Sequence, residues 1–487
     1  MLLSKLLNNL SVIQVLDNSD DFEVENITID SREVQRGSIF VAIKGFKTDG
    51  HLFIQQAISN GASAIVLEDD KNISEQLFTK NNVTKILVEN SRKALAKLAD
   101  TFFDSPSKKL NLIGITGTKG KTTTTYFLKN IFENANMKTG LIGTNKNMIG
   151  KKEIKTKMTT PESHIINSLL SEMVKEDCSQ CVMEVSSHSL ELHRVDFLDF
   201  NVGVFTNITS DHLDFHNNFE NYLAAKKIFF DQLKPKAKVI YNKDDKNHSV
   251  LLENCTAEKI SYALHSNADI KIENVNFSLE GTEFQIKYLE NTYHLNTKLI
   301  GEFNAYNATA AFAASVFSGV SITQAIEGIK STPQVPGRFE VISKGNKKVI
   351  VDYSHTADSL KQALHAIKYI VKDEHPVYTI FGCGGDRDKT KRPVMGSIAE
   401  QLSNYVYVTS DNPRTEDPYA ILSDIEKGLQ KDNHKIIENR EEAIKRAIEN
   451  SEDDAVILIA GKGHETYQEI NGTRNYFSDK EVAEKYL

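Results

Sequence analysis

The sequence lacks any long hydrophobic run. No segment of its 487 residues contains the roughly 18 consecutive apolar residues that a membrane-spanning helix requires. The N-terminal segment MLLSKLLNNLSVIQV is amphipathic and has no small-residue cleavage site of the kind that ends a signal peptide. We interpret this segment as a first helix, predict no membrane insertion and expect a cytoplasmic protein.

Cysteine is scarce, with four residues in the chain. Cys178 and Cys181 are spaced as C-x-x-C, a pattern that also occurs in zinc sites and redox centres. No second cysteine pair and no histidine pair follows at zinc-finger spacing, and Cys181 leads directly into a predicted strand. We therefore expect buried free thiols rather than a metal or redox site.

The chain also lacks an excess of positive charge. Its 58 Lys and Arg against 66 Asp and Glu give a net charge of -8 and a pI of about 6.0. Proteins that bind nucleic acid in bulk favour basic surfaces, so we predict no nucleic-acid partner. Small anionic substrates are still compatible with this composition, because local basic clusters can override the net charge.

No internal repeat or low-complexity tract interrupts the chain, whose length predicts about three domains. The segments SPSKK and STPQVPGRFE are the two linker-like breaks, and strand patterns alternate with helical patterns after each of them. We predict an α/β protein with a smaller N-terminal α/β domain (1–107), a central P-loop-type ATPase domain with a parallel sheet (108–335) and a C-terminal Rossmann-like domain (336–487).

A glycine-rich loop opens the predicted central domain. The strand NLIGIT is followed by GTKGKTTTT and a predicted helix from about 121 to 135. In such a loop the backbone N–H groups and the helix N-terminus bind phosphates, while Lys121 would reach the β- and γ-phosphates and Thr122 would ligate Mg²⁺. The strict G-x-x-x-x-G-K-T pattern is not met, since the first glycine falls one position early at Gly114. The alternative is a glycine-rich turn with a chance Lys-Thr.

Carboxylates and imidazoles cluster after two further predicted strands. Glu184 ends the strand CVMEVS, and Asp211, His212, Asp214 and His216 follow the strand VGVFTN. Beside a phosphate loop, these residues indicate a Mg²⁺ site that neutralises charge during phosphoryl transfer. Two alternatives are a satisfied carboxylate near the sheet edge and a helix cap with exposed polar residues.

The segment TSDNPRTEDP follows the strand YVYVT, at the strand end where open α/β sheets bind ligands. Arg414 in this segment has the guanidinium group that binds a carboxylate or phosphate with two parallel hydrogen bonds. The alternative is that Arg414 pairs with Glu416 or Asp417 on the surface.

An ordered set of motifs resembles the Mur ligase family over nearly the whole chain, and most closely its diaminopimelate-adding branch. In chain order the motifs are IDSREVQRGSIFVAIKGFKTDGH, GTKGKTT, MEVSSHSLELHRV, FTNITSDHLDFH, YLAAKKIFF, GEFNAYNATAA, GRFE, VDYSHT, GCGGDRD, DNPR and GKGHE. The resemblance implies a ligase in which ATP phosphorylates the D-Glu carboxylate of UDP-N-acetylmuramoyl-L-alanyl-D-glutamate. The amine of meso-diaminopimelate then attacks the acyl phosphate, in peptidoglycan precursor synthesis.

The resemblance also implies the residues that handle ATP and Mg²⁺. Lys121, Glu184, His212 and Lys226 would be catalytic, and Lys226 matches a lysine that the family carries as a carbamate. Thr122, Glu184, His212 and Lys226 would ligate Mg²⁺. ATP would contact Gly117, Thr118, Lys119, Gly120, Lys121, Thr122, Thr123, Asn304, Arg338 and Asp352.

The same resemblance assigns the two other substrates. The UDP-muramoyl-dipeptide would contact Ser31, Phe46, Lys47, Thr48, Thr159, Thr160, Ser186 and Arg194. Leu192 stands where the family usually has Gln, and His193 or a water molecule could supply that polar contact. Diaminopimelate would contact Arg387, Asp411, Asn412, Pro413, Arg414, Gly461 and Glu465. Arg414 would bind its far carboxylate and Glu465 its far ammonium, and L-lysine lacks that carboxylate.

Three other functions compete with this one. A different ligase of the superfamily, such as folylpolyglutamate synthetase, would share the phosphate loop but not the N-terminal motif or DNPR. A nucleotide-switched binding protein would hydrolyse ATP or GTP without an amino acid. An inactive paralogue would not need Lys121, Thr122, Glu184, His212 and Lys226, which are all present.

We expect the protein to be a monomer.

Overall fold

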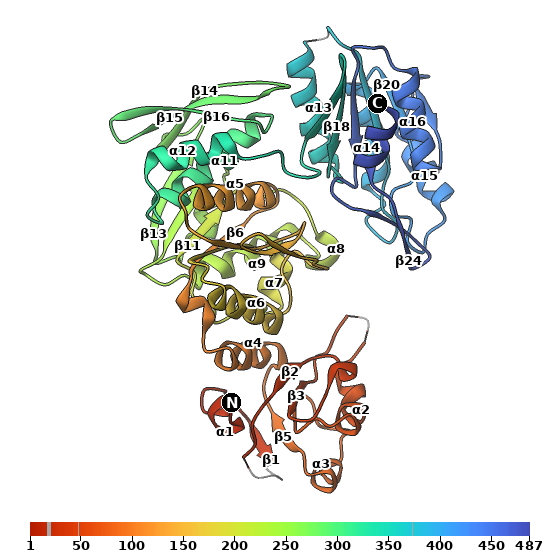
Figure 1. Cartoon of the computed structure of the whole chain (residues 1–487). Coiled ribbons are helices and arrows are strands. Elements are labelled where there is room, and N and C mark those ends of the chain that lie inside the picture. The colour runs from red at the N-terminus through yellow and green to blue at the C-terminus, as the bar shows by residue number, and fades with distance from the viewer. Residues whose placement is uncertain (17–20, 47, 373) are drawn as a thin grey trace.

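The computed structural model describes residues 1–16, 21–46, 48–372 and 374–487, which form three sheets with flanking helices (Figure 1). The sheets follow one another along the chain, and the first lies at the opposite end of the molecule from the third (Figure 1). Helices cover both faces of each sheet with apolar side chains. The predicted α/β class is therefore confirmed. Among the described residues, every helix is too short or too polar to span a lipid bilayer.

The N-terminal sheet has the order β1-β5-β4-β3-β2, with β1 antiparallel to β5 and the other pairs parallel. The predicted first helix is shorter than its amphipathic segment, which goes on to form β1. The elements are α1 (Leu3–Leu7), β1 (Gln14–Leu16), β2 (Asn26–Thr28), η1 (Ser31–Glu33), β3 (Ser38–Val41), η2 (Gly50–Phe53), α2 (Ile54–Ser59), β4 (Ala64–Leu67), α3 (Glu75–Asn81), β5 (Thr84–Leu87), α4 (Ser91–Phe102) and η3 (Pro106–Lys109).

The central sheet is parallel only in its middle. Its order is β16-β15-β14-β13-β12-β11-β6-β10-β7-β8-β9, and antiparallel strands extend it at both edges. Its elements are β6 (Asn111–Thr116), α5 (Lys121–Asn134), β7 (Thr139–Ile142), β8 (Asn147–Ile149), β9 (Lys152–Ile154), α6 (Ser163–Lys175), β10 (Gln180–Glu184), α7 (Ser187–Glu191), β11 (Val202–Phe205), α8 (Leu213–His216), α9 (Phe219–Asp231), β12 (Lys238–Asn242), α10 (His248–Leu251), β13 (Glu258–Ala263), β14 (Ile270–Ser278), β15 (Gly281–Tyr288), β16 (Asn291–Thr297), α11 (Glu302–Val316) and α12 (Ile322–Ser331).

Strand β6 shows how the sequence builds the centre of this sheet. Ile113 and Ile115 pack against α5 on one face, while Leu112 packs against the opposite core. Gly114 lies inside the strand rather than in the phosphate loop, and a Cβ there would come within 2.6 Å of the Phe229 ring. The early glycine of the motif therefore allows β6 to pack closely on α9.

The four cysteines are buried free thiols, as predicted.

The C-terminal sheet has the order β17-β18-β22-β19-β20-β21, and only β17 is antiparallel to its neighbour. A separate hairpin, β23–β24, lies beside it. The elements are β17 (Glu340–Lys344), β18 (Lys347–Asp352), α13 (Ala357–Val371), β19 (Val377–Phe381), α14 (Lys391–Leu402), β20 (Tyr405–Val408), α15 (Pro418–Glu426), β21 (His434–Ile436), α16 (Arg440–Asn450), β22 (Val456–Ala460), β23 (Tyr467–Ile470), β24 (Thr473–Tyr476) and α17 (Asp479–Tyr486).

A buried ion pair fastens the C-terminal helix to this sheet. The Arg440 guanidinium donates to both carboxylate oxygens of Asp479 at 2.7 and 2.8 Å, and to the carbonyl of Ala460 at 3.0 Å. Both charged side chains are fully buried. Removing one member of such a pair leaves the other charge uncompensated in a medium that solvates it poorly.

We expect Asp479→Asn to destabilise the C-terminal domain by about 3–5 kcal/mol, because Arg440 would lose its counter-charge while staying buried. Urea unfolding followed by far-UV circular dichroism measures the shift in midpoint. Glu441→Gln is the matched control, since Glu441 pairs with Lys485 at the exposed surface of the same helix pair and should change little. Equal midpoints for the two variants would contradict the proposed role of the buried pair.

Candidate active site

The loop between β6 and α5 has the geometry that its glycines predict. Gly117 and Gly120 have backbone φ angles of 148° and 85°, which residues other than glycine rarely adopt. A Cβ at Gly117 would lie 2.0 Å from the Thr206 hydroxyl, and one at Gly120 would lie 2.3 Å from the Asn307 amide oxygen. At these two glycines the loop brings backbone without side chains close to the first turn of α5, the arrangement in which backbone N–H groups can bind phosphate.

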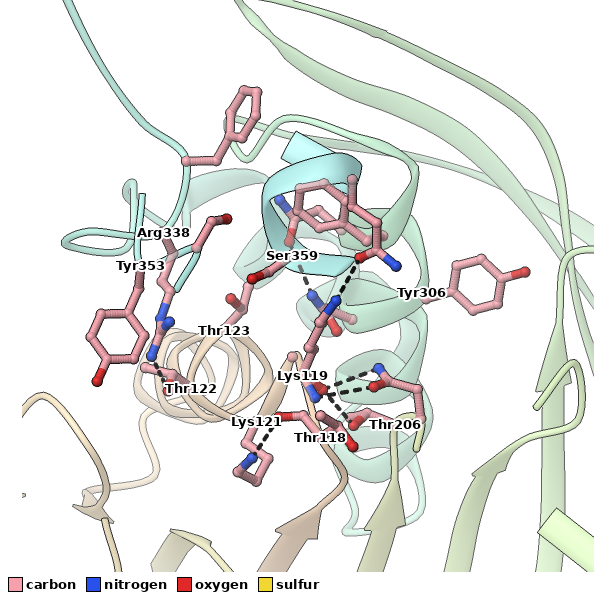
Figure 2. A pocket seen from close by; sticks show the side chains of 18 of the residues that line it. Thr118, Lys119, Lys121, Thr122, Thr123, Thr206, Tyr306, Arg338, Tyr353 and Ser359 are labelled. Atoms are coloured by element: carbon pink, nitrogen blue, oxygen red, sulfur yellow. Dashed lines mark hydrogen bonds between the residues drawn. The ribbon is translucent and has the colours of Figure 1, made fainter. Parts of the chain in front are cut away.

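Residues that follow β11 hold this loop in place. The Asn207 side chain accepts from the Lys119 N–H at 3.0 Å, and the Thr206 hydroxyl donates to the Lys119 carbonyl at 2.6 Å. The Thr118 hydroxyl donates to the Thr209 carbonyl at 3.1 Å. Hydrogen bonds thus join the loop after β6 to the residues at the end of the adjacent strand β11; Figure 2 shows Thr118, Lys119 and Thr206 among them.

Two lysine side chains converge on one carbonyl of the loop. Lys121 donates to the Gly117 carbonyl at 2.8 Å, and Lys226 on α9 donates to the same oxygen at 2.9 Å. Burial lowers the pKa of Lys121, and burial together with the nearby Lys121 charge lowers the pKa of Lys226 well below its usual value. The site concentrates positive potential where a polyphosphate would lie.

Glu184 lies at the end of β10 and is almost completely buried. Its carboxylate accepts from the Thr122 hydroxyl at 3.1 Å and from the N–H and hydroxyl of Thr144, both at 2.9 Å. Sequence analysis missed Thr144, which directly follows β7 but belongs to no motif. A carboxylate beside a threonine hydroxyl is an oxygen donor set that fits Mg²⁺. Both oxygens of Glu184 accept hydrogen bonds within the protein, as the alternative of a satisfied carboxylate also predicts.

His212 begins α8 in a left-handed conformation with φ of 54°. Its ring lies 4.9 Å from the ring of His188, and its Nε2 lies 3.7 Å from Asp211. His216 is buried and bonds to Ser187, so only part of the predicted polar cluster is available to a ligand. In the described part of the chain, no three His, Cys, Asp or Glu side chains are grouped to hold a metal ion.

The C-terminal sheet contributes the other wall of the nucleotide pocket. Arg338 lies 3.4 Å from the Thr122 hydroxyl and stacks on the Tyr353 ring at 4.5 Å (Figure 2). Asp352 accepts from the Phe339 N–H at 2.8 Å and so shapes the turn that carries Arg338. With Asn304, these residues line a cavity of about 760 Å³ that contains the phosphate loop. Tyr353, within the motif VDYSHT, was not predicted as a site residue.

Two ion pairs join elements on either side of the site. Lys119 of the phosphate loop pairs with Asp358 at the start of α13. Arg387 pairs with Asp214 of α8 at 3.1 Å, between two half-exposed side chains. Each pair joins the central part of the chain to the C-terminal part. Arg387, predicted to meet the amino acid, therefore has a protein carboxylate as its partner in this structure.

The residues predicted for the muramoyl-dipeptide gather at the end of β10. The Thr160 hydroxyl donates to the Glu184 carbonyl at 2.8 Å and accepts from the Ser186 N–H at 3.1 Å. Arg194 donates to the Thr160 carbonyl at 3.1 Å. The Thr159 hydroxyl accepts from that of Thr144 at 3.0 Å, so this cluster adjoins Glu184. His193 beside them is already bonded to Asp196 at 2.9 Å.

The N-terminal domain places fewer predicted residues near this site. Phe46 is 75% exposed and makes an edge contact with Phe215 of α8, with ring centroids 5.4 Å apart. Ser31 is buried and its hydroxyl bonds to Gln56 at 3.0 Å. Thr48 is exposed. Lys47 lies outside the described residues.

A second cluster lies at the ends of β20 and β22. The Asn412 amide donates to Glu465 at 2.8 Å. Gly461, with φ of 117°, lies so close to Asp411 that a Cβ would come within 2.6 Å of its carboxylate. Pro413 is buried, and its carbonyl would lie 2.0 Å from a Cβ on Gly385. The segments DNPR, GCGGDRD and GKGHE are therefore in direct contact.

Arg414 is available for a ligand in this cluster. Its guanidinium donates to the Gly385 carbonyl at 2.5 Å, and no ion pair to it occurs within the described ranges. Glu416 instead pairs with Arg392 at 3.0 Å, and Asp417 caps α15. The alternative that Arg414 is neutralised by Glu416 or Asp417 is therefore wrong.

A stack of side chains connects the two clusters. The Tyr353 ring that underlies Arg338 also lies 5.2 Å from the His464 ring, next to Glu465. A Cβ on Gly337 would come within 2.0 Å of the His464 nitrogen, so the two segments are in backbone contact. Side-chain and backbone contacts thus connect the nucleotide cavity to the segment GKGHE, which carries Glu465.

Comparisons with known proteins agree with this geometry. Three family models match in chain order: the catalytic domain of the Mur ligase family over residues 23–103, the Mur ligase middle domain over 115–315 and the glutamate ligase domain of Mur ligases over 337–463. A protein from Clostridium acetobutylicum named UDP-N-acetylmuramoyl-L-alanyl-D-glutamate--2,6-diaminopimelate ligase 1 is 44% identical over 96% of this chain and 95% of its own.

Two further relatives cover nearly the whole chain. A ligase of the same name, without the final numeral, from Alkaliphilus metalliredigens is 44% identical over 99% of this chain and 97% of its own. A solved structure of a UDP-N-acetylmuramoyl-L-alanyl-D-glutamate--2,6-diaminopimelate ligase is 31% identical with a TM-score of 0.68, covering 95% of this chain and 94% of that one. Since models and relatives together span all three sheets and the phosphate loop, the chain belongs to the Mur ligase family of ATP-dependent acid–amino-acid ligases.

Proposed function

We propose that this ligase joins meso-diaminopimelate to the D-Glu carboxylate of UDP-N-acetylmuramoyl-L-alanyl-D-glutamate and converts ATP to ADP and phosphate, in peptidoglycan precursor synthesis. The observation that carries the proposal is Arg414, whose guanidinium lies against Gly384 and Gly385 and makes no ion pair with the residues that the structure describes. The names of relatives that are 44% identical over almost the whole chain support the same substrate pair.

The reaction needs an activated acyl group. A free carboxylate is a poor acyl donor because oxide is a poor leaving group, so the γ-phosphoryl group of ATP first moves to a carboxylate oxygen. The neutral amine of diaminopimelate then attacks the acyl carbon and loses a proton. The tetrahedral intermediate collapses by breaking its C–O bond to phosphate. Keeping water away from the acyl phosphate is essential, and binding of the substrates in the cavity beside the phosphate loop would displace water from it.

We assign the nucleotide to the phosphate loop and its cavity. Backbone N–H groups of Gly117–Thr123 and the N-terminus of α5 would bind the phosphates, with Lys121 beside them. Asn304, Arg338 and Asp352 would complete the pocket. Glu184 and Thr122, with His212 and Lys226, would hold Mg²⁺, which when bound neutralises charge that develops on the transferred phosphoryl group.

We assign the other two substrates to opposite sides of that loop. Thr159, Thr160, Ser186 and Arg194 would bind the muramoyl-dipeptide, with Ser31 and the loop 46–48 at its UDP end. Arg387, Asp411–Arg414, Gly461 and Glu465 would bind diaminopimelate. The domains 1–107, 108–335 and 336–487 would then carry the UDP end, ATP and the amino acid, respectively. We further propose a cytoplasmic monomer.

We propose that Lys226 carries a carbamate in the active enzyme. As free amines, Lys226 and Lys121 both lie against the Gly117 carbonyl, and their like charges repel each other in a buried setting. Burial and the nearby Lys121 charge lower the pKa of Lys226, which favours the neutral amine. That amine would add to carbon dioxide and release one proton. The product is an anion, which would turn the repulsion into attraction and add oxygen ligands for Mg²⁺.

The competing functions fit the site less well. A nucleotide switch has no use for an unpaired Arg414 beside Glu465, and a folylpolyglutamate-type ligase would not need a residue that recognises a second ammonium and carboxylate. An inactive paralogue would not preserve two buried lysines at one carbonyl, because that arrangement is costly unless anions bind there.

The first test measures phosphate release from ATP in the presence of UDP-N-acetylmuramoyl-L-alanyl-D-glutamate. We expect sustained release with meso-diaminopimelate and little with L-lysine or with no amino acid, since the acyl phosphate needs its matched amine. Equal release with lysine would contradict the role given to Arg414. Phosphate release that depends on neither the UDP-muramoyl-dipeptide nor the amino acid would instead support a nucleotide switch.

We expect Arg414→Ala to lower kcat/KM for meso-diaminopimelate by a factor on the order of 30 to 5,000, because a charged partner worth about 2–5 kcal/mol is lost. Discrimination against lysine should shrink by the same factor, while KM for ATP stays unchanged. Arg446→Ala is the matched control, since Arg446 pairs with Glu442 on the exposed face of α16. A general loss of activity with discrimination intact would count against the assignment.

We expect Lys226→Met to reduce kcat by more than about tenfold, because the loss of a group that supports a metal costs at least that much. With ¹³C-bicarbonate, the native protein should give a carbamate carbon resonance in NMR that the variant lacks. Lys227→Met, which changes the neighbouring lysine that pairs with Asp231, is the control. A native spectrum without this resonance would overturn the carbamate.

A further inference from the structure

Lys462 is a fully buried lysine in the segment GKGHE, and none of the assignments above gives it a role. It directly follows Gly461 and lies three residues before Glu465, both of which are assigned to the amino-acid substrate. A charged side chain without solvent contact must be compensated by its neighbours, so its contacts indicate what it does.

The Lys462 ammonium touches two of the proposed substrate ligands. It donates to the Asn412 side-chain oxygen at 3.1 Å and to Glu465 Oε2 at 3.2 Å. Its remaining side faces the Tyr467 ring, with 5.4 Å between the nitrogen and the ring centroid. Both polar contacts are therefore made to residues that we assign to the amino-acid substrate.

These contacts fix the orientation of the Asn412 amide. Its oxygen accepts from Lys462 and also from the Glu469 N–H at 2.9 Å, so both acceptor positions are used. Its nitrogen must then point the other way, where it donates to Glu465 Oε2 at 2.8 Å. An ammonium can only donate, so Lys462 excludes the flipped amide.

The same contacts leave one oxygen of Glu465 open. Oε2 receives hydrogen bonds from both Lys462 and Asn412, whereas Oε1 receives none from the part of the chain that the structure describes. Lys462 therefore holds the carboxylate by one oxygen and presents the other.

We propose that Lys462 is a positioning residue for the amino-acid substrate: it orients Asn412 and Glu465 so that Glu465 Oε1 accepts from the far ammonium group of a diamino acid. This inference rests on the proposed function, since it assumes that Glu465 binds that ammonium. Lys462 itself does not touch the substrate. Its effect passes through Glu465 and Asn412, and a purely structural ion pair would have no such specific effect.

The test is Lys462→Met, which keeps the length of the side chain and removes its charge. We expect KM for meso-diaminopimelate to rise by a factor on the order of 10 to 100, as for a lost hydrogen bond to a charged group. KM for ATP and for the UDP-muramoyl-dipeptide should stay within about twofold of the native values. Lys480→Met is the matched control, because Lys480 pairs with Glu340 at a partly exposed position of the same domain.

A double-mutant cycle with Glu465→Gln separates positioning from structure. If Lys462 acts through Glu465, the double variant should have nearly the same KM as Glu465→Gln alone. Lys462→Gln, which keeps one donor for Asn412, should give an intermediate KM and serves if the Met variant does not fold.

Three outcomes would overturn the inference: additive effects in the cycle, an equal rise in KM for all three substrates, or a Lys462→Gln variant with native KM. The native enzyme distinguishes this failure from that of the proposed function. If native phosphate release does not depend on diaminopimelate, the proposed function itself fails. If it does depend on diaminopimelate but the Lys462 variants show no specific effect, only this inference fails.

Discussion

Two buried amines share the carbonyl oxygen of Gly117, and the arrangement of the central site depends on that crowding. Lys121 arrives from α5 and Lys226 from α9, so the contact fixes both helices against the end of β6. Like charges so close together are unfavourable unless anions face them. Glu184 and Asp211 oppose the loss of charge on Lys121, and a bound polyphosphate would add to them. The two buried lysines at this carbonyl therefore favour anionic ligands.

The part of the site that lies near the phosphate loop was predictable because strand order and local pattern determine it. The predicted helix from 121 to about 135 corresponds to α5, Lys121–Asn134. Parallel strands β6, β10 and β11 are neighbours, so the segments that follow them meet at one edge. That geometry brings Glu184 to Thr122 from a distance of 62 residues in the sequence. Each of these motifs could be placed at the sheet edge from the strand pattern that directly precedes it in the sequence.

Other features depend on packing between distant parts and were not accessible from local pattern. The antiparallel hairpin β14–β15 extends the central sheet until Phe277 stacks on Tyr369 of α13, with 4.5 Å between ring centroids. No periodicity in the sequence specifies that contact. Phe277 and Tyr369 both line the nucleotide cavity, so their stacking helps to set its width. Similarly, the partner of Arg387 in α8 follows from how the two sheets face each other. The amphipathic N-terminus also divided into a short helix and β1 rather than one helix.

The stack of Arg338, Tyr353 and His464 explains how one site can handle two incompatible demands. The acyl phosphate must be protected from water, while a polar amino acid must reach it. A planar aromatic ring between a guanidinium and an imidazole excludes water without adding charge, and it keeps the Arg338 cation near the Thr122 hydroxyl. On its other side lies His464, next to Glu465, the residue that we propose binds the far ammonium group. Under the proposed assignments, one aromatic ring would separate the residues that recognise the second ammonium and carboxylate from those that activate the acyl donor.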